Sequence, residues 1–238
     1  AEQESAAALA KLCGHLPLAL RIAGARLAAR PHWTIEQLAG RLEDETRRLD
    51  ELKHGDLGIR VSISLTYESV SEDARRLFRR LAILEFRHFS GWVAAALLDR
   101  DPADAQDLLD DLADTQLIET TDAGYGVHSQ YRFHDLIRVF ARERLAAEEA
   151  VADRNAALER VLGGLLFLTA EAHRREYGGD YVQVHSEAPR WPLPGRLVER
   201  LVMAPLHWYE RERLTLVAGI RQAAQAGFVE LCWDLALS

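Results

Sequence analysis

The sequence has few of the features that mark secreted, disulfide-bonded or membrane proteins. Its two cysteines, Cys13 and Cys232, form neither a disulfide framework nor a metal cluster, and they suit a reducing compartment. No run of about 18 apolar residues occurs, so no membrane span is expected. The N-terminus lacks a basic leader and an apolar signal core, and its pattern is typical of the middle of a helix. These features predict a cytoplasmic protein and a fragment of a longer chain.

Motifs for nucleotide hydrolysis are also missing. The sequence contains no G-x-x-x-x-G-K-[ST] loop to hold phosphates, and no predicted strand ends in paired acids that could hold magnesium. The pair His134-Asp135 could belong to an HD-type metal phosphohydrolase. That fold needs further His and Asp ligands on neighbouring helices, however, and the other histidines occur singly without ligand spacing. The chain is therefore predicted not to be an enzyme by itself.

The composition is that of a globular protein with an acidic balance. Of 238 residues, 48% are hydrophobic and 28% are charged, which is enough for a substantial core and for one large domain or several small ones. The formal net charge of −8 disfavours nonspecific attraction to nucleic acid or to anionic lipid. Partners of either kind are not expected from composition alone.

The segment YRFHDLIRVFARERL, residues 131–145, changes its period in the middle. Tyr131 and Phe133 alternate with an arginine, which predicts a strand. From Asp135 onward the apolar residues recur about every 3.6 positions, which predicts an amphipathic helix with Asp135 as its N-cap. His134 then lies at the positive end of the helix dipole, where an anion such as a nucleotide phosphate can bind. The alternative is that Asp135 only caps the helix and His134 only packs.

Residues 1–54 contain start and stop signals for three short helices. Gly14 is placed to end the first helix in a left-handed conformation. Pro17 is placed in the first turn of the second helix, where its missing N–H costs nothing. Thr34 and Gln37 form a capping box for the third helix. Short helices with tight links predict a small bundle.

Three helices followed by two strands predict a winged helix within residues 55–148. The third helix carries six aspartates, and no lysine or arginine occurs between Arg100 and Arg132, so contact with DNA phosphates would be repulsive. Direct DNA binding by this domain is therefore not expected. The helices are predicted to begin at Ser71, Ser90 and Asp101-Pro102, and the strands to be Leu117–Thr120 and Tyr131–Phe133, joined by a turn at Asp122–Gly126.

The remaining residues, 149–238, are predicted to be mainly helical. A leucine-rich helix is predicted to be interrupted at Gly163-Gly164, and a proline- and glycine-rich linker follows over residues 177–195. Two further helices are joined at Ala226-Gly227. The aromatic residues of this region are expected in the core, and no complete 34-residue repeat is present.

Several motifs resemble one family of nucleotide switches. Phe133-His134-Asp135 resembles the M-H-D signature of the NB-ARC or STAND-type signal-transduction ATPases, which include plant resistance proteins, apoptosome scaffolds and many bacterial transcriptional regulators. The segment CGHLPLAL, residues 13–20, resembles the family's G-L-P-L-A-L motif, although His15 replaces a glycine or small residue. Trp208 and Glu212-Arg213 resemble a W-x-x-x-E-R segment that leads toward tetratricopeptide repeats in actinobacterial antibiotic-regulatory proteins.

The resemblance also bears on residues 59–70. Alternation of Ile59, Val61, Ile63 and Leu65 is typical of a strand, whereas the family carries a helical L-S-Y-x-x-L segment that LTYESV, residues 65–70, resembles. The fold class expected is therefore mainly α. It comprises a helical bundle (1–54), a winged helix with a two-stranded wing (55–148) and a C-terminal helical, TPR-like lead-in (149–238).

The family resemblance implies a function for the two motifs. His134 would touch the β-phosphate of ADP, with Asp135 beside it, while Leu16 and Pro17 would pack on the adenine side. The nucleotide, ADP or ATP, would be held by the P-loop domain of a full-length parent that lies N-terminal to this chain, and no nucleotide is expected to bind this chain tightly. Partners expected are that P-loop domain, a C-terminal TPR-like region and further copies on activation. The alternative function is an autonomous winged-helix DNA-binding module of a transcription factor.

Overall fold

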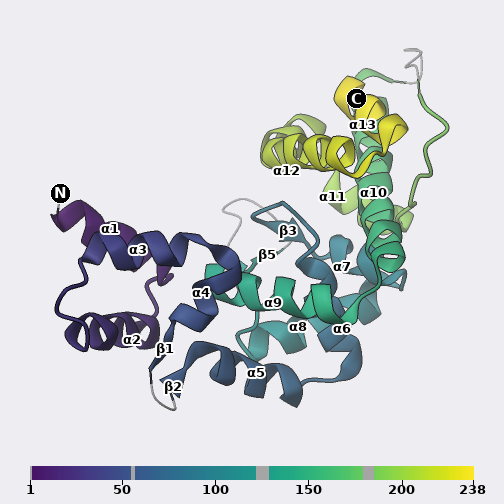
Figure 1. Cartoon of the computed structure of the whole chain (residues 1–238). Coiled ribbons are helices and arrows are strands. Elements are labelled where there is room, and N and C mark those ends of the chain that lie inside the picture. Colours follow the sequence, from purple (N-terminus) through teal and green to yellow (C-terminus); the bar gives the residue numbers. More distant parts are fainter. Residues whose placement is uncertain (1, 55–56, 122–128, 179–184) are drawn as a thin grey trace.

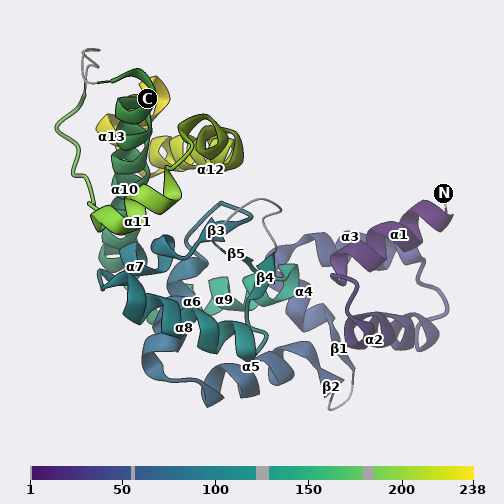
Figure 2. The ribbon, with the colours of Figure 1, turned by 180° about the vertical axis from the view of Figure 1, so that it is seen from behind.

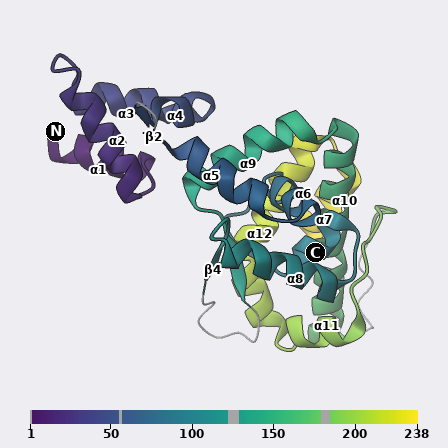
Figure 3. The same cartoon turned by 90° about the horizontal axis from the view of Figure 1, so that it is seen from below.

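The computed structural model describes residues 2–54, 57–121, 129–178 and 185–238, and over these it is mainly α-helical as the sequence predicted. Figure 1 shows three groups of elements in chain order. A group of four helices lies to one side, a winged helix occupies the middle, and a second set of helices rises from the other side. Figure 2 shows the same arrangement from behind, and Figure 3 shows from below that the group of four helices stands apart, while the C-terminal helices overlap the winged helix in that view.

The first group, called the helical module here, follows the predicted start and stop signals. Gly14 has a φ of +60° after the first helix, Pro17 begins the second, and Thr34 and Gln37 form the capping box at 3.0 and 3.1 Å. A fourth helix and a short hairpin after it were not predicted. The elements are α1 (Glu2–Leu12), α2 (Pro17–Ala28), α3 (Ile35–Glu43) and α4 (Glu45–Glu51), then strands β1 (Lys53–His54) and β2 (Leu57–Gly58).

The predicted winged helix is present, with one strand more than the predicted two. Its sheet has the order β3-β5-β4 and is antiparallel throughout, with Phe89 opposite Tyr131 and Thr120 opposite Tyr131 on the other side. The predicted turn at Asp122–Gly126 lies outside the described residues. The elements are α6 (Glu72–Leu81), β3 (Phe89–Ser90), α7 (Trp92–Leu98), α8 (Pro102–Asp114), β4 (Glu119–Thr121), β5 (Gln130–Arg132) and α9 (Asp135–Glu148).

Two of the three helix beginnings predicted at Ser71, Ser90 and Asp101-Pro102 are confirmed, each with a side-chain cap. Ser71 Oγ accepts from Ala74 N at 3.2 Å, and Asp101 Oδ1 accepts from Ala103 N at 2.8 Å. The prediction for Ser90 is wrong. Ser90 is part of strand β3, and its backbone pairs with Gln130 of β5. The helix α7 begins after Gly91, which provides no side-chain cap.

The segment that begins at Ile59 is a helix, α5 (Ile59–Ser69), so the resemblance gave the correct prediction and the alternation did not. Its apolar residues fall on two sides of the helix. Ile59 and Ile63 are buried, whereas Val61 is 55% and Leu65 is 69% exposed. The four-residue spacing of the buried pair is the helical signal, and the two exposed residues obscured it.

The C-terminal helices are built around α10 (Val151–Tyr177), which runs unbroken through Gly163 and Gly164, contrary to the prediction. Both glycines serve close packing. A Cβ at Gly163 would lie 2.5 Å from the Pro189 carbonyl, and one at Gly164 would lie 2.6 Å from the Trp92 ring. The segment after α10 is free of helix and strand where described, as predicted, and leads to α11 (Gly195–Leu201), α12 (Pro205–Ala226) and α13 (Val229–Leu237).

The prediction that the aromatic residues of 149–238 lie in the core holds fully for Trp208, which is 1% exposed, whereas Tyr177 is 55% exposed. Four others are partly buried against the core: Phe167, Trp191, Tyr209 and Phe228. Within the described residues, no helix combines the length and apolarity needed to cross a membrane.

Candidate functional site

His134 lies where β5 gives way to α9. The backbone of His134 is extended (φ −67°, ψ 140°), and Asp135 is the first helical residue, so His134 is the N-cap. Its Nδ1 accepts from Leu136 N at 3.3 Å. The prediction that Asp135 caps the helix is therefore wrong by one residue, because the helical dihedrals begin at Asp135 itself. The carboxylate of Asp135 is left exposed in the first turn, at the positive end of the helix dipole.

The imidazole of His134 joins the two sequence motifs that resemble the nucleotide switches. Its Nε2 lies 2.7 Å from the carbonyl oxygen of Gly14, 120 residues away in the sequence. A carbonyl can only accept, and Nδ1 already accepts from a backbone N–H, so Nε2 carries the proton of a neutral ring. His134 thus donates a hydrogen bond to Gly14 of the helical module and at the same time caps α9 of the winged helix.

Gly14 allows this contact through both its conformation and its size. The residue has a φ of +60°, which L side chains rarely adopt, and a Cβ here would lie 2.2 Å from His134 Cε1. The turn is held by backbone bonds from Gly14 N to Lys11 O at 2.8 Å and from His15 N to Ala10 O at 2.9 Å. The close approach of the ring therefore depends on a glycine at the end of α1.

Leu16 and Pro17 follow this turn directly. Leu16 is half-buried and precedes α2 as its N-cap, and Pro17 is exposed at the first helical position. The structure thus brings His134 to the beginning of the motif that contains Leu16 and Pro17. A role for these two residues or for Asp135 in holding a nucleotide stays a prediction.

Sequence reasoning missed a basic pocket beside this junction. The pocket has a volume of about 540 Å³ and lies between the helical module and the winged helix. Phe133 and Asp135, on either side of His134, form part of its wall. Six lysine and arginine side chains line it against three acidic ones, in a chain whose net charge is −8. The charged residues are Lys11, Arg48, Arg87, Arg132, Arg138 and Arg142, with Glu43, Glu85 and Asp135.

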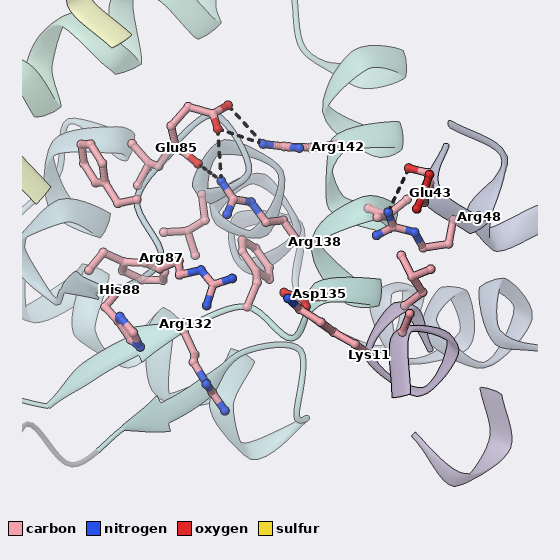
Figure 4. A pocket seen from close by; sticks show the side chains of 18 residues that line it. Lys11, Glu43, Arg48, Glu85, Arg87, His88, Arg132, Asp135, Arg138 and Arg142 are labelled. Carbon is pink, nitrogen blue, oxygen red and sulfur yellow. Dashed lines mark hydrogen bonds and ion pairs between the residues drawn. The ribbon is translucent and has the colours of Figure 1, made fainter. Parts of the chain in front are cut away.

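Only part of this positive charge is neutralised within the pocket. Arg142 pairs with Glu85 at 3.1 Å, and Arg138 donates to the carbonyl of Leu84 and lies 3.8 Å from Glu85 (Figure 4). Arg48 donates to the carbonyl oxygens of Leu42 and Glu43. These contacts fix the walls of the pocket, and the carboxylate of Glu85 is already paired with two arginines.

A cluster of three basic side chains, Arg87, His88 and Arg132, lies at the other end (Figure 4). Phe89 pairs with Tyr131, so the same antiparallel register places His88 beside Arg132. Burial, followed by the charges of Arg132 and Arg87, lowers the pKa of His88 below its usual 6.5. The run F-R-H-F at 86–89, a basic pair between aromatic residues, was the local signal that could have pointed to this cluster.

The structure does not gather a metal-ligand set in the part of the chain that it describes. No group of three or more His, Cys, Asp and Glu side chains there has the arrangement of a metal site. His134 instead has both ring nitrogens engaged with backbone groups.

Comparison with known proteins agrees with this architecture. Residues 66–153 match the family model described as the MalT winged helix domain. The chain is 39% identical over 242 residues to a regulatory protein AfsR of Streptomyces griseus, a match that covers 100% of this chain and 24% of the relative. It is 38% identical over 238 residues to the AfsR of Streptomyces coelicolor, with 98% and 23% covered.

A third similarity is to a plant protein. The disease resistance protein RML1A of Arabidopsis thaliana is 29% identical over 139 residues, which cover 58% of this chain and 12% of the relative. The chain spans about a quarter of the length of the regulatory relatives that it matches.

Proposed function

The chain belongs to the NB-ARC/STAND-type regulators found in actinobacteria, and we propose on this basis that it is the switch portion of a longer transcriptional regulator. In this proposal the helical module and the winged helix close around ADP that a P-loop domain of the parent holds. Exchange of ADP for ATP releases the closed state and lets copies of the parent assemble. The C-terminal helices lead into a TPR-like region, and the parent acts in the cytoplasm on genes such as those for antibiotic production.

The observation that carries the proposal is the hydrogen bond from His134 to Gly14. It links the M-H-D-like and G-L-P-L-like motifs across the two parts that would have to separate. The residues present fit a diphosphate. His134 already carries its proton on Nε2, where a phosphate oxygen could replace the neutral carbonyl of Gly14 as acceptor, and Leu16 and Pro17 stand next in the chain to line an adenine.

The energetic effect of such a replacement is sufficient for a switch. ADP, when bound, supplies a negatively charged acceptor. A bond from His134 to that charge is worth about 1.5–3 kcal/mol, against about 0.5–1.5 kcal/mol for a neutral bond. The difference of roughly 1–1.5 kcal/mol corresponds to about a tenfold change in an equilibrium between closed and open states. The parent is then an ATPase, and the nucleotide of the switch is held by its P-loop domain.

The alternative is an autonomous DNA-binding module, and the exposed face of α8 argues against it. In winged helices the third helix reads the major groove. The carboxylates of Asp104, Asp107 and Asp111 are exposed on α8, so docking this helix on DNA would bring negative charge against phosphate.

The test is retention of ADP by the purified full-length parent. We expect His134→Ala to lose ADP faster than wild type by about tenfold, and to form more oligomer by light scattering without an activating signal. His32→Ala serves as the matched control, because His32 is an exposed histidine of the helical module. Equal ADP retention and equal oligomer content in wild type and His134→Ala would show that His134 only packs and that the proposal is wrong.

A further inference from the structure

The basic pocket contains more positive charge than its own contacts explain. Glu85 is engaged by Arg138 and Arg142, and Figure 4 shows Lys11 extending from α1 toward Asp135 on the opposite wall. Arg132 pairs with Glu119 at 2.7 Å, but that pair is on the surface and is screened by water. Arg87 has no hydrogen-bond or ion-pair partner among the described residues.

We propose that the Arg87–His88–Arg132 cluster binds the phosphoryl group of a small anionic ligand. The strand register places His88 beside Arg132, and Arg87 precedes His88 in the chain, so three basic side chains repel one another and an anion between them removes that repulsion. Two of the three are arginines, whose planar guanidinium groups suit bidentate bonds to phosphate oxygens. The inference does not depend on the proposed ADP switch, since His134 itself is not part of the pocket wall.

A small ligand fits this pocket better than an extended acidic segment of protein. The pocket volume of about 540 Å³ is within the range of small-molecule sites, roughly 300–1,000 Å³. Figure 4 shows its two glutamates away from the cluster, with Glu85 beside Arg138 and Arg142 and Glu43 beside Arg48. Glu85 and Glu43 would face the flanks of a long acidic chain, whereas a single phosphoryl group can sit at the cluster alone.

The ligand would also touch both parts of the molecule. Ala8, Lys11 and Leu12 of α1 contribute one wall, and β5, the start of α9 and residues 84–89 contribute the other. A phosphoryl ligand in the pocket therefore adds a connection between the helical module and the winged helix.

Calorimetric titration of this 238-residue chain with sodium pyrophosphate tests the proposal. We expect binding that weakens as salt is added, and about a tenfold loss of affinity in Arg87→Gln, the loss of one charge-assisted bond. Arg213→Gln is the matched control, because Arg213 is exposed on α12 outside the pocket. Pyrophosphate should also raise the pKa of His88, followed by NMR, since a bound anion favours the protonated imidazole.

Further titrations identify the source of the phosphoryl group and test an acidic peptide as the alternative ligand. Tighter binding of ADP than of pyrophosphate would support a nucleotide as the ligand, and equal binding would support a free phosphate compound. The ADP switch is read on the parent through His134→Ala, and this site is read on the 238-residue chain through Arg87→Gln, so either proposal can fail without the other. Equal pyrophosphate affinity in wild type and Arg87→Gln, or tighter binding of a glutamate hexapeptide than of pyrophosphate, would overturn the proposal.

Discussion

Gly14 and His134 constrain each other directly. The ring of His134 takes the space that a side chain at position 14 would occupy, and its Nε2 proton satisfies the carbonyl of the same residue. Two independent demands therefore fall on Gly14, a left-handed backbone and the absence of a Cβ. His134 in turn caps α9 through Nδ1 and contacts the helical module through Nε2 of the same neutral ring.

Gly14→Ala should destabilise the chain by about 2 kcal/mol or more, because it adds left-handed strain of roughly 1–2 kcal/mol and a clash with the imidazole. Gly24→Ala is the control. Gly24 lies within α2 with no atom near its Cβ position, and alanine should be neutral or stabilising there. Urea unfolding measures both. In the double variant Gly14→Ala/His134→Ala the clash is removed, so costs that simply add would contradict this account.

His88 predicts a pH dependence of stability. Its pKa in the folded chain lies below 6.5, so the unfolded chain takes up a proton more readily than the folded one. The contribution of His88 is fully present above the unfolded pKa and is lost as pH falls through the folded pKa. We expect the fall in urea midpoint between pH 7.5 and pH 5.5 to be smaller in His88→Gln than in wild type. An equal fall in the two proteins would show that burial and the charges of Arg132 and Arg87 do not lower the pKa of His88.

At the scale of elements, a buried carboxylate at the end of α9 holds α6 in place. Glu149 accepts from Arg79 at 3.0 Å and from Arg80 at 3.1 Å, and all three residues are buried. Arg80 also donates to the carbonyl of Leu97, which ties α7 to the same point. The junction from α9 to α10 is thus fixed to the first helices of the winged helix.

Glu149→Gln should cost roughly 3 kcal/mol, since it leaves Arg80 buried without a carboxylate while keeping the shape of the side chain. Glu148→Gln is the adjacent control. Its side chain is 34% exposed, accepts from Tyr67 and forms an ion pair with Arg79, so its loss should cost about 1 kcal/mol or less. Chemical unfolding of the two variants compares them. Similar losses would mean that burial does not distinguish these carboxylates.

Features that depend on neighbours in sequence were predictable. The capping box at Thr34 and Gln37 and the caps at Ser71 and Asp101 are local hydrogen bonds, and the sequence shows them directly. Features that depend on distant contacts were not. Gly163 and Gly164 are typical helix interrupters by sequence, and only the approach of residue 189 and of Trp92 explains why α10 continues through them.

The same distinction applies to the candidate site. His134 was found because it stands at a change of period in the sequence. Its bond to Gly14 could be suspected only from the resemblance, since no local pattern relates the two residues. The basic pocket draws on α1, α3, α4, the segment before β3, β5 and α9. Because its side chains come from so many separate segments, the pocket has no regular residue spacing that a reading of the sequence could detect.

The whole molecule has its winged helix between two other groups of helices (Figure 1), and the carboxylates of Asp104, Asp107 and Asp111 on α8 are exposed. The pocket with the basic cluster opens instead between the winged helix and the helical module. Positive and negative charges therefore occupy different places on the winged helix, and the surface that reads DNA in other winged helices is the negative one.

This separation predicts that the chain does not retard duplex DNA at physiological salt. DNA binding gains affinity when basic side chains release counterions from phosphates, and the aspartates of α8 would oppose that release. Replacing both Asp107 and Asp111 by lysine should instead produce weak, salt-sensitive binding, with Glu199→Lys/Glu230→Lys, two exposed positions outside the winged helix and the pocket, as a control of equal charge. Gel retardation with promoter fragments measures all three proteins. A clear, salt-sensitive shift by the wild-type chain, lost in a version without the winged helix, would mean that this domain reads DNA despite its charge.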